Sequence, residues 1–319
     1  MPDDVVRIMD ESWDRLILLD ACRYDVFEKI RQDCLPEGRV SCRQSIGSAT
    51  TEWRDNSFPD VYPEVVYVSS NPYINSQKAV SGFAGADHFF QVIDVWKTGW
   101  DPIKGTVLPQ TITREALKAI RRWPDKKTII HYLQPHAPYL EFGSDCAGFP
   151  VPDMVTQQVL RGTTRTGSGT QMKTKIYGRL YPVMKKISCW GNHPDWLLSQ
   201  ALRLPPCSPM DMVRRKYGKK GLRRAYEENL SAVLKEIVQL IRYLSGDIVI
   251  TSDHGEYLGE DCCYSHFAGS DSPYLRNIPW WTVRKEMAEP SPEPEADFGQ
   301  TPDIEDDEIQ KRLKDLGYL

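Results

Sequence analysis

The 319-residue chain lacks the features that mark a membrane-spanning or zinc-knuckle protein. No stretch approaches the roughly 18 to 20 apolar residues that a membrane-spanning helix needs. None of the eight cysteines forms a Cys-x-x-Cys pair, so we expect free thiols rather than a structural zinc site. The N-terminus is acidic and lacks the apolar run of a signal peptide, so we expect a cytoplasmic protein.

Charge of one sign is not in excess either. The net charge is -4, with 40% hydrophobic and 26% charged residues. This balance is that of an ordinary soluble protein with a real core, and it does not predict nucleic-acid binding. The length suits one large domain, with or without decorations.

Short apolar runs predict buried strands that alternate with helices. The strands are expected at Leu16–Leu19, Val65–Val68, Thr128–Tyr132 and Asp247–Thr251, with a weaker one at Phe89–Val95. Apolar residues at helical spacing predict helices over Thr113–Arg122 and Tyr226–Leu244. The alternation indicates an α/β fold: a doubly wound, mostly parallel central sheet with helices on both faces.

Two regions depart from the average composition. Residues 161–224 carry 15 Lys and Arg against two Asp, whereas the chain from Glu286 onward carries 11 acidic residues against three basic ones. We expect an α/β domain over residues 1–286 with a basic insertion at about 145–224. An acidic, Pro-rich tail with a short terminal helix is expected over residues 287–319.

Polar residues follow three of the predicted strands, where loops of an open α/β sheet converge. Asp20 follows the first strand as a metal ligand or a helix cap. His131 lies within the third strand and His136 just beyond it, each as a site residue or a structural histidine. Asp253 and His254 directly follow the last strand, and an adjacent carboxylate and imidazole suit zinc, manganese or a similar divalent ion.

Four segments, in order along the chain, resemble motifs of the alkaline phosphatase superfamily, in particular its sulfatase-like and phosphoglycerol- or phosphoethanolamine-transferase-like members. They are LLDACRYD from residue 18, QPHAPY from 134, SDHGEYLGE from 252 and RLKDLGYL from 312. The resemblance implies a sulfatase-like catalytic domain with a reduced C-terminal part, and Asp20, Asp253 and His254 as metal ligands.

The resemblance also implies an alcohol nucleophile within residues 45–60. Thr50 follows Gly47 at the expected spacing and is our choice, both as nucleophile and as metal ligand. Ser48 is close behind it, and a Ser/Thr helix cap is the alternative. A divalent cation would lower the pKa of such an alcohol and aim its oxygen at phosphorus or sulfur. Zinc or manganese is favoured, with calcium and magnesium left open.

The chain departs from typical sulfatases, which convert a residue within Cys-x-Pro-x-Arg into formylglycine, because it has no such motif. Phosphoester chemistry is therefore favoured, as hydrolase or transferase. The alternatives are a sulfatase that uses an unmodified alcohol and a non-catalytic member that binds an anionic glycan or lipid headgroup. Arg23 would stabilise the anion or pair with Asp25. His136 and His266 would serve the substrate side or a second metal.

The basic segment bears on partners. It would attract an anionic small-molecule, glycan or lipid-headgroup ester, or provide a peripheral membrane contact. It would otherwise be a solvated face or a partner of the acidic tail. No nucleic-acid motif accompanies these charges, so no nucleic-acid partner is expected. The sequence does not predict an oligomeric state.

Overall fold

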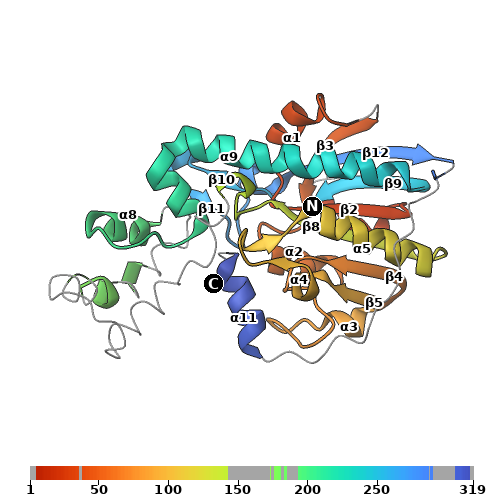
Figure 1. Cartoon of the computed structure of the whole chain (residues 1–319), viewed down its shortest axis with the longest axis horizontal. Helices are drawn as coiled ribbons and strands as arrows, with labels where there is room; N and C mark the ends of the chain where they lie inside the picture. Colours follow the sequence, from red (N-terminus) through yellow and green to blue (C-terminus); the bar gives the residue numbers. More distant parts are fainter. Residues whose placement is uncertain are drawn as a thin grey trace.

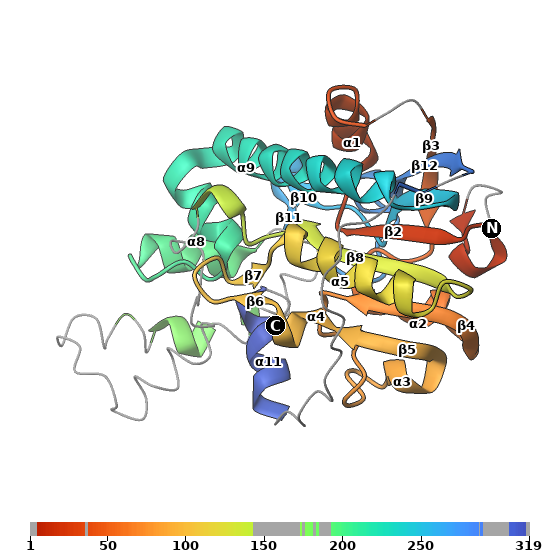
Figure 2. The same cartoon turned by 45° about the vertical axis from the view of Figure 1, so that its right-hand side comes forward.

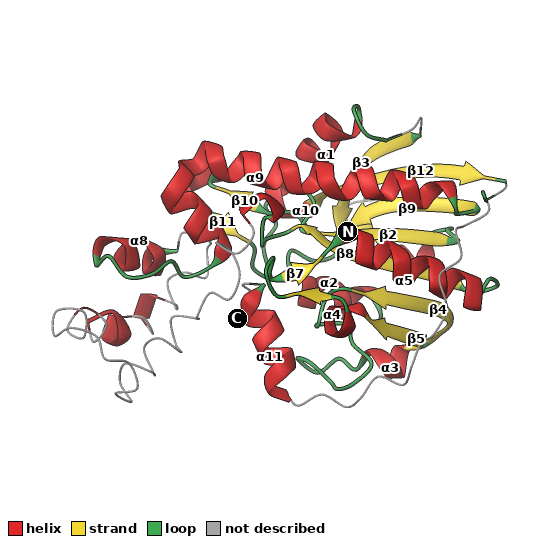
Figure 3. Ribbon diagram, viewed as in Figure 1, coloured by secondary structure: helices red, strands yellow, loops and turns green. Residues whose placement is uncertain are grey.

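The computed structural model describes residues 5–35, 38–142, 173, 176–180, 183–184, 193–286, 288–289 and 306–316. These residues form one large sheet with helices against it (Figures 1 and 2). The distribution of helices and strands is shown in Figure 3.

The central sheet has eight strands in the order β1-β3-β12-β9-β2-β8-β4-β5. All neighbouring pairs are parallel except those of β12, which is antiparallel to both β3 and β9. The strands are β1 (Val5–Val6), β2 (Arg15–Asp20), β3 (Arg39–Ser45), β4 (Tyr62–Ser69), β5 (Phe89–Asp94), β8 (Lys127–Pro135), β9 (Gly246–Ser252) and β12 (Asn277–Lys285). The predicted mostly parallel α/β sheet is confirmed.

Alternating residues of the central strands enter two separate cores, one on each face of the sheet. Ile17 and Leu19 of β2 pack with the helices α1 (Tyr24–Arg31), α5 (Pro109–Arg122) and α9 (Pro209–Arg242). Leu16 and Leu18 face the other way and pack with Trp53 of α2 (Thr50–Ser57). Successive side chains of a strand point to opposite faces, so a strand with no polar position is buried on both.

The five predicted strands correspond to β2, β4, β8, β9 and β5, and the two predicted helices to α5 and the second half of α9. Ser208 caps α9 by accepting a hydrogen bond from the amide of Asp211, and Pro209 occupies its first turn. Gly218 breaks the helical geometry with a φ of 69°, a left-handed value that favours glycine. The helix therefore has two halves, and only the second showed a clear apolar stripe in the sequence.

Shorter elements complete the described chain. They are η1 (Ile8–Asp10), α3 (Gly85–His88), α4 (Val95–Thr98), β6 (Trp100–Asp101), β7 (Thr106–Val107), α8 (Pro194–Ala201), β10 (Tyr257–Leu258), η4 (Glu260–Cys262), β11 (Tyr264–Ser265), α10 (Pro273–Arg276) and α11 (Asp306–Asp315). Ile309, Leu313 and Leu316, at the end of the chain, are buried in the same core as α5 and α9. Half of the expected insertion and most of the acidic tail lie outside the described residues, and the domain division stays a prediction.

Candidate active site

The candidate site lies where β2, β8 and β9 end side by side. Asp20 is the last residue of β2, His136 follows β8, and Asp253 and His254 follow β9. Because β2 pairs in parallel with both β8 and β9, all three strands deliver these side chains to the same edge of the sheet. Asp20, Asp253 and His254 have no exposed surface, and His136 is 4% exposed.

Thr50 reaches this edge on α2, the helix whose Trp53 packs with Leu16 and Leu18 on the other face of the sheet from α1, α5 and α9. Its Oγ1 donates a hydrogen bond of 2.9 Å to Oδ2 of Asp253 and lies 3.1 Å from Nε2 of His254. Thr50 is the first residue of α2, and the cap residue is Ala49, which has no side-chain capping bond. The hydroxyl therefore faces the carboxylate and imidazole rather than the backbone of its own helix.

Ser48 lies two residues before Thr50, and its hydroxyl makes hydrogen bonds with other groups. Its Oγ lies 2.9 Å from both Oε2 of Glu52 and the carbonyl of Phe267, and it accepts a bond of 3.0 Å from the amide of Ser270. These contacts hold the loop that follows His266 against α2. The geometry therefore favours Thr50 over Ser48 as the oxygen next to Asp253 and His254.

A first group of possible metal ligands comprises Asp20, His131 and Asp253, whose ligand atoms all lie within 4.8 Å of one another. His131 is held by the hydroxyl of Tyr67, 3.0 Å from its Nδ1, while its buried Nε2 makes no hydrogen bond. Asn71, which follows β4, donates a bond of 2.8 Å to Oδ2 of Asp20. The sequence analysis did not consider Asn71, although its place just after a predicted strand could have suggested it.

A second group comprises His136, Glu256 and His266, also within 4.8 Å. His266 Nδ1 lies 3.0 Å from Oε1 of Glu256, and the buried Oε2 of Glu256 makes no hydrogen bond. The rings of His254 and His266 are 4.2 Å apart, so the two groups adjoin. Glu256 was visible in the SDHGE run but was given no role in the sequence analysis.

The electrostatics of both groups suit a cation. Asp20, Asp253 and Glu256 are three carboxylates with no exposed surface, and burying such charges is costly unless they bind a cation or neutralise. Burial lowers the pKa of His131, His136 and His266 to about 4 each. These imidazoles are therefore neutral at neutral pH, which is the form that binds metal.

The pKa values of Asp253 and Glu256 are shifted in opposite directions. Burial would raise the pKa of Asp253, but His254 and His131 lower it overall. Burial raises the pKa of Glu256 to about 7. The residues present thus fit a divalent ion, because Asp20 and Asp253 lie with His131 in one group of possible ligands and Thr50 and His254 contact Asp253. Imidazole and carboxylate ligands are typical of zinc.

The loop between Asp253 and Glu256 is tied tightly to the end of β2. The amides of Ala21 and His254 donate bonds of 2.9 and 2.8 Å to Oδ1 of Asp253. A Cβ at Gly255 would overlap the carbonyl of Tyr274, so only glycine fits this turn. The carboxylate is therefore held with Oδ2 facing Thr50.

Arg23 is buried but does not face the candidate ligands. Its guanidinium makes ion pairs of 2.7 Å with Asp25 and with Glu260, and it donates to the carbonyl of Glu256 at 3.2 Å. Burial alone would lower the pKa of Arg23, but Asp25 and Glu260 raise it overall. These contacts favour a role for Arg23 in holding the loop of residues 256–260. The ion pair with Asp25 is the alternative to anion binding that the sequence analysis left open.

The loop that carries His136 is held by Asn229 of α9. Its amide nitrogen donates bonds of 3.2 to 3.3 Å to the carbonyls of Pro135, His136 and Pro138, and its oxygen accepts from the amide of Leu140 at 2.8 Å. A buried polar side chain on an otherwise apolar helix face thus positions His136.

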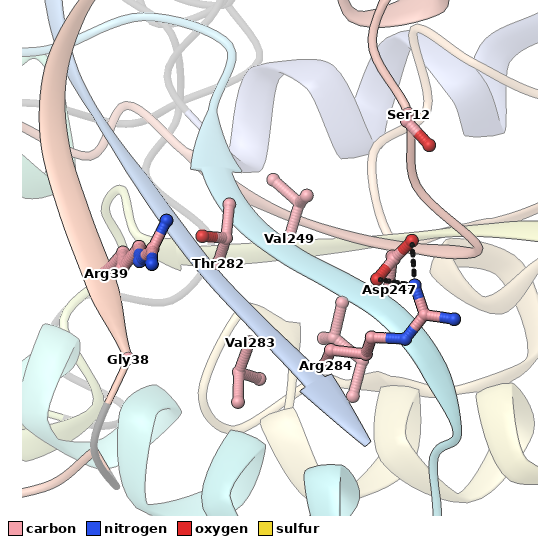
Figure 4. Close-up of a pocket in the computed structure, with 9 residues that line it drawn as sticks. Ser12, Gly38, Arg39, Asp247, Val249, Thr282, Val283 and Arg284 are labelled. Atoms are coloured by element: carbon pink, nitrogen blue, oxygen red, sulfur yellow. Dashed lines mark hydrogen bonds and ion pairs between the residues drawn. The ribbon is translucent and has the colours of Figure 1, made fainter. Parts of the chain in front are cut away.

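A surface pocket of about 610 Å³ lies elsewhere, beside the strands β3, β9 and β12 (Figure 4). It is lined by Arg39, Asp247, Thr282 and Arg284 among others, and Arg284 pairs with Asp247 at 3.4 Å. Asp247 is at the start of β9, whereas the candidate ligands follow its end. This pocket is therefore separate from the candidate site.

No protein-family model matches the chain, and no curated protein matches it. Solved structures do. The chain is similar to the soluble domain of lipooligosaccharide phosphoethanolamine transferase A from Neisseria meningitidis, with 14% identity over 85% of this chain and 76% of that one and a TM-score of 0.45. It spans 51% of the integral membrane form of that transferase, at 14% identity over 89% of this chain and a TM-score of 0.47.

Two further similarities fall in the same group. The C-terminal periplasmic domain of EcEptC from Escherichia coli, in complex with Zn, shares 11% identity over 86% of this chain and 74% of that one, with a TM-score of 0.45. Phosphonate monoester hydrolase from Silicibacter pomeroyi shares 14% identity over 86% and 68%, with a TM-score of 0.40. These four similarities, at 11 to 14% identity, are similarities of fold alone.

The expected cytoplasmic location is contradicted by these matches. Similar domains from Campylobacter jejuni and Escherichia coli are periplasmic by name, and one Neisseria meningitidis match is an integral membrane protein. The cytoplasmic prediction is therefore withdrawn. Among the residues that the structure describes, no helix combines the length and the apolar character needed to cross a membrane.

Proposed function

We propose that the chain is a metal-dependent hydrolase or transferase of phosphate or sulfate esters, with phosphoesters favoured and Thr50 as the nucleophile. One observation carries the proposal. Thr50 Oγ1 lies 2.9 Å from Oδ2 of Asp253 and 3.1 Å from Nε2 of His254, although these residues are more than 200 positions apart in sequence. An alcohol held against a buried carboxylate and a neutral imidazole is the arrangement that metal-activated nucleophiles need.

Asp20, Asp253, His254 and Thr50 would hold the ion, which would lower the pKa of the Thr50 hydroxyl and stabilise negative charge on the ester oxygens. Thr50 Oγ1 would attack phosphorus, forming an O–P bond as the bond to the ester oxygen breaks. The ring of His266 lies 5.3 Å from that of His136 and 4.2 Å from that of His254. His136 and His266 would protonate the leaving oxygen or bind the anion. Water or an acceptor alcohol would then release the group from Thr50.

Glu256 adds a second option for the two histidines. With His136 and His266 it forms a compact group of one carboxylate and two neutral imidazoles. This group suits a second cation. In the other option, the two imidazoles would bind the substrate anion. Zn²⁺ is the proposed ion at Asp20, Asp253, His254 and Thr50, and Mn²⁺, Ca²⁺ and Mg²⁺ remain to be compared with it. The proposed substrate is an anionic small-molecule, glycan or lipid-headgroup ester.

The test is turnover by purified, metal-loaded protein of matched aryl phosphate monoester, phosphate diester and sulfate ester substrates. Thr50→Ala and Asp253→Asn are each expected to lower kcat/KM by about a thousandfold or more, because each removes a member of one catalytic unit. Ser48→Ala is the matched control, and we expect it to lose much less. Turnover that persists in Asp253→Asn would refute the assignment of the metal site.

The substrate comparison separates the remaining alternatives. A preference for the sulfate ester, lost in Thr50→Ala, would identify a sulfatase that uses an unmodified threonine. A stoichiometric bound ion with no turnover of the three esters would favour a non-catalytic member that binds an anionic glycan or headgroup. Release of the group to an added alcohol rather than to water would identify a transferase.

A further inference from the structure

One end of the molecule exposes apolar and cationic side chains together. Eight large apolar side chains of the described residues are strongly exposed, and five of them belong to the chain between residues 173 and 224. These five are Ile176, Leu180, Val183, Leu197 and Tyr217, with exposed fractions of 42 to 58%. Large exposed apolar groups gathered in one region mark an interaction surface more often than scattered ones do.

The exposed charged side chains of this region are positive. Arg179, Arg203, Lys216 and Lys220 are exposed within it. The acidic residues among its described positions are Asp195 and Asp211, which are 8% and 0% exposed. Asp211 is also neutralised by ion pairs of 2.7 and 2.6 Å with Arg214 and Arg215. The outward charge is therefore positive.

Hydrogen bonds join the three segments of this end, which we call the docking end: residues 176–180 with 183–184, α8, and α9 as far as residue 224. The hydroxyl of Tyr177 lies 3.5 Å from Sγ of Cys207, just before α9. Arg215 of α9 donates to the carbonyls of Trp196 and Leu204 at 3.3 and 2.8 Å. In Figures 1 and 2 the three segments lie together, beyond β10 and β11.

The docking end also adjoins the hairpin that leads to the candidate site. Arg223 of α9 pairs with Glu260 at 2.5 Å, and Lys219 donates to the carbonyl of Gly259. This hairpin runs directly into His266. A surface held by the docking end would therefore lie on the same side of the molecule as the ends of β2 and β9.

We infer that the docking end binds the surface of an anionic lipid bilayer. Cationic side chains alone would suit an acidic polysaccharide equally well, but a polysaccharide offers no apolar phase for Leu180, Val183 and Leu197. A bilayer offers both, because basic residues are attracted to anionic headgroups while apolar side chains enter the acyl boundary. The inference does not depend on the ester chemistry proposed above.

The experiment is co-sedimentation of the full chain with phosphatidylcholine vesicles that contain or lack phosphatidylglycerol. We expect binding to the anionic vesicles only, weakening with salt. Lys216→Glu/Lys220→Glu is expected to weaken it by at least about tenfold, since each surface basic residue contributes about fivefold. Leu180→Glu/Val183→Glu/Leu197→Glu is expected to weaken it at least as much, because it removes the side chains that insert.

The matched control is Val61→Glu/Phe90→Glu, which alters exposed apolar residues 66% and 45% exposed at the starts of β4 and β5. Binding within about twofold of the original chain is expected for this control and for Thr50→Ala, with circular dichroism showing that all variants are folded. Absence of binding by the original chain would overturn the inference. An equal loss of binding in the control variant would overturn it too. Undiminished binding by the apolar triple variant would also overturn it, because the basic residues alone would then account for binding and would suit a polyanion instead of a bilayer.

Discussion

At the scale of single residues, the candidate site is defined by carboxylates that have no exposed surface. Asp20, Asp253 and Glu256 converge with four imidazoles in a space where none of the three acids is exposed. The network of backbone amides around Asp253 fixes its Oδ1 and leaves Oδ2 to Thr50. Such a cluster has a cost in the metal-free protein that a bound cation would offset.

Glu256 makes the number of ions testable. With His136 and His266 it forms a group separate from that of Asp20 and Asp253, so we expect two Zn²⁺ per chain. Replacing Glu256 with Gln removes the charge but keeps the shape, and is expected to lower the second ion's affinity by about 10- to 100-fold. Zinc content by atomic emission after dialysis at graded free zinc is the measurement.

The comparison for that variant is Glu227→Gln, which removes a carboxylate that is paired with Lys29 and belongs to neither group. It should retain both ions. Two ions in Glu256→Gln with unchanged affinity would assign His136 and His266 to the substrate side, the alternative that the sequence left open.

Sequence reasoning reached Asp20, Thr50, Asp253 and His254 because strand ends and motifs are local signals. It could not separate Thr50 from Ser48, since both lie in one short segment. Their separation depends on partners distant in sequence: Asp253 for Thr50, and Phe267 and Ser270 for Ser48. Arg23 shows the same limit, because its pairing with Glu260 spans 237 positions.

At the scale of elements, the hairpin β10–β11 connects the candidate site to the docking end. Glu260 is its anchor, since it accepts from Arg23 at 2.7 Å, from Arg223 and from the amide of Leu258 at 2.7 Å. The hairpin is short, with two residues in each strand, and short hairpins are not stable alone. The position of His266 therefore depends on this carboxylate as well as on its own contact with Glu256.

Glu260→Gln tests that dependence. Glu260 is half-buried, so loss of its charged hydrogen bonds is expected to lower the free energy of unfolding by about 1 to 3 kcal/mol. We expect kcat/KM to fall as well, because His266 would lose its fixed place. Urea denaturation and steady-state kinetics on the same preparation measure the two effects. Unchanged kinetics would show that the hairpin does not position His266.

The elements that the sequence did not predict have clear physical reasons. β3 reads RVSCRQS and is largely exposed, so it lacks the apolar run of a buried strand. β12 contains Pro279, which argues against an interior strand. The structure accommodates this proline because it pairs with Cys42 of β3, whereas the pairing with β9 begins only at Trp281.

At the scale of the whole molecule, the buried histidines couple stability to pH. Burial lowers the pKa of His131, His136 and His266 to about 4, against an ordinary value of about 6.5. Between these values the unfolded chain binds three protons that the folded chain does not. Glu256, with its pKa raised by burial to about 7, acts in the opposite direction but is one group against three.

We therefore expect the metal-free protein to lose stability as the pH falls from about 6.5 to about 4, where the unfolded state binds more protons. Chelator-treated protein and thermal melts at a series of pH values measure this. The stabilisation from the three histidines should be fully present above pH 6.5, where it is opposed by Glu256, whose pKa shift is similar in size to that of one histidine. A melting temperature that rises on acidification through this range would contradict the assignment of neutral, buried imidazoles.

The strand order has a consequence for how the protein is made. β3 leads directly into α2 and Thr50, yet its neighbours in the sheet are the two-residue β1 and β12. β12 covers residues 277–285, so the segment that carries Thr50 cannot join the sheet until that part of the chain has left the ribosome. Domains assembled from pairings so distant in sequence form late. A nascent chain arrested before β12 would hold Asp20, Asp253 and His254 but no docked Thr50, so the candidate site would not form until residues 277–285 have emerged.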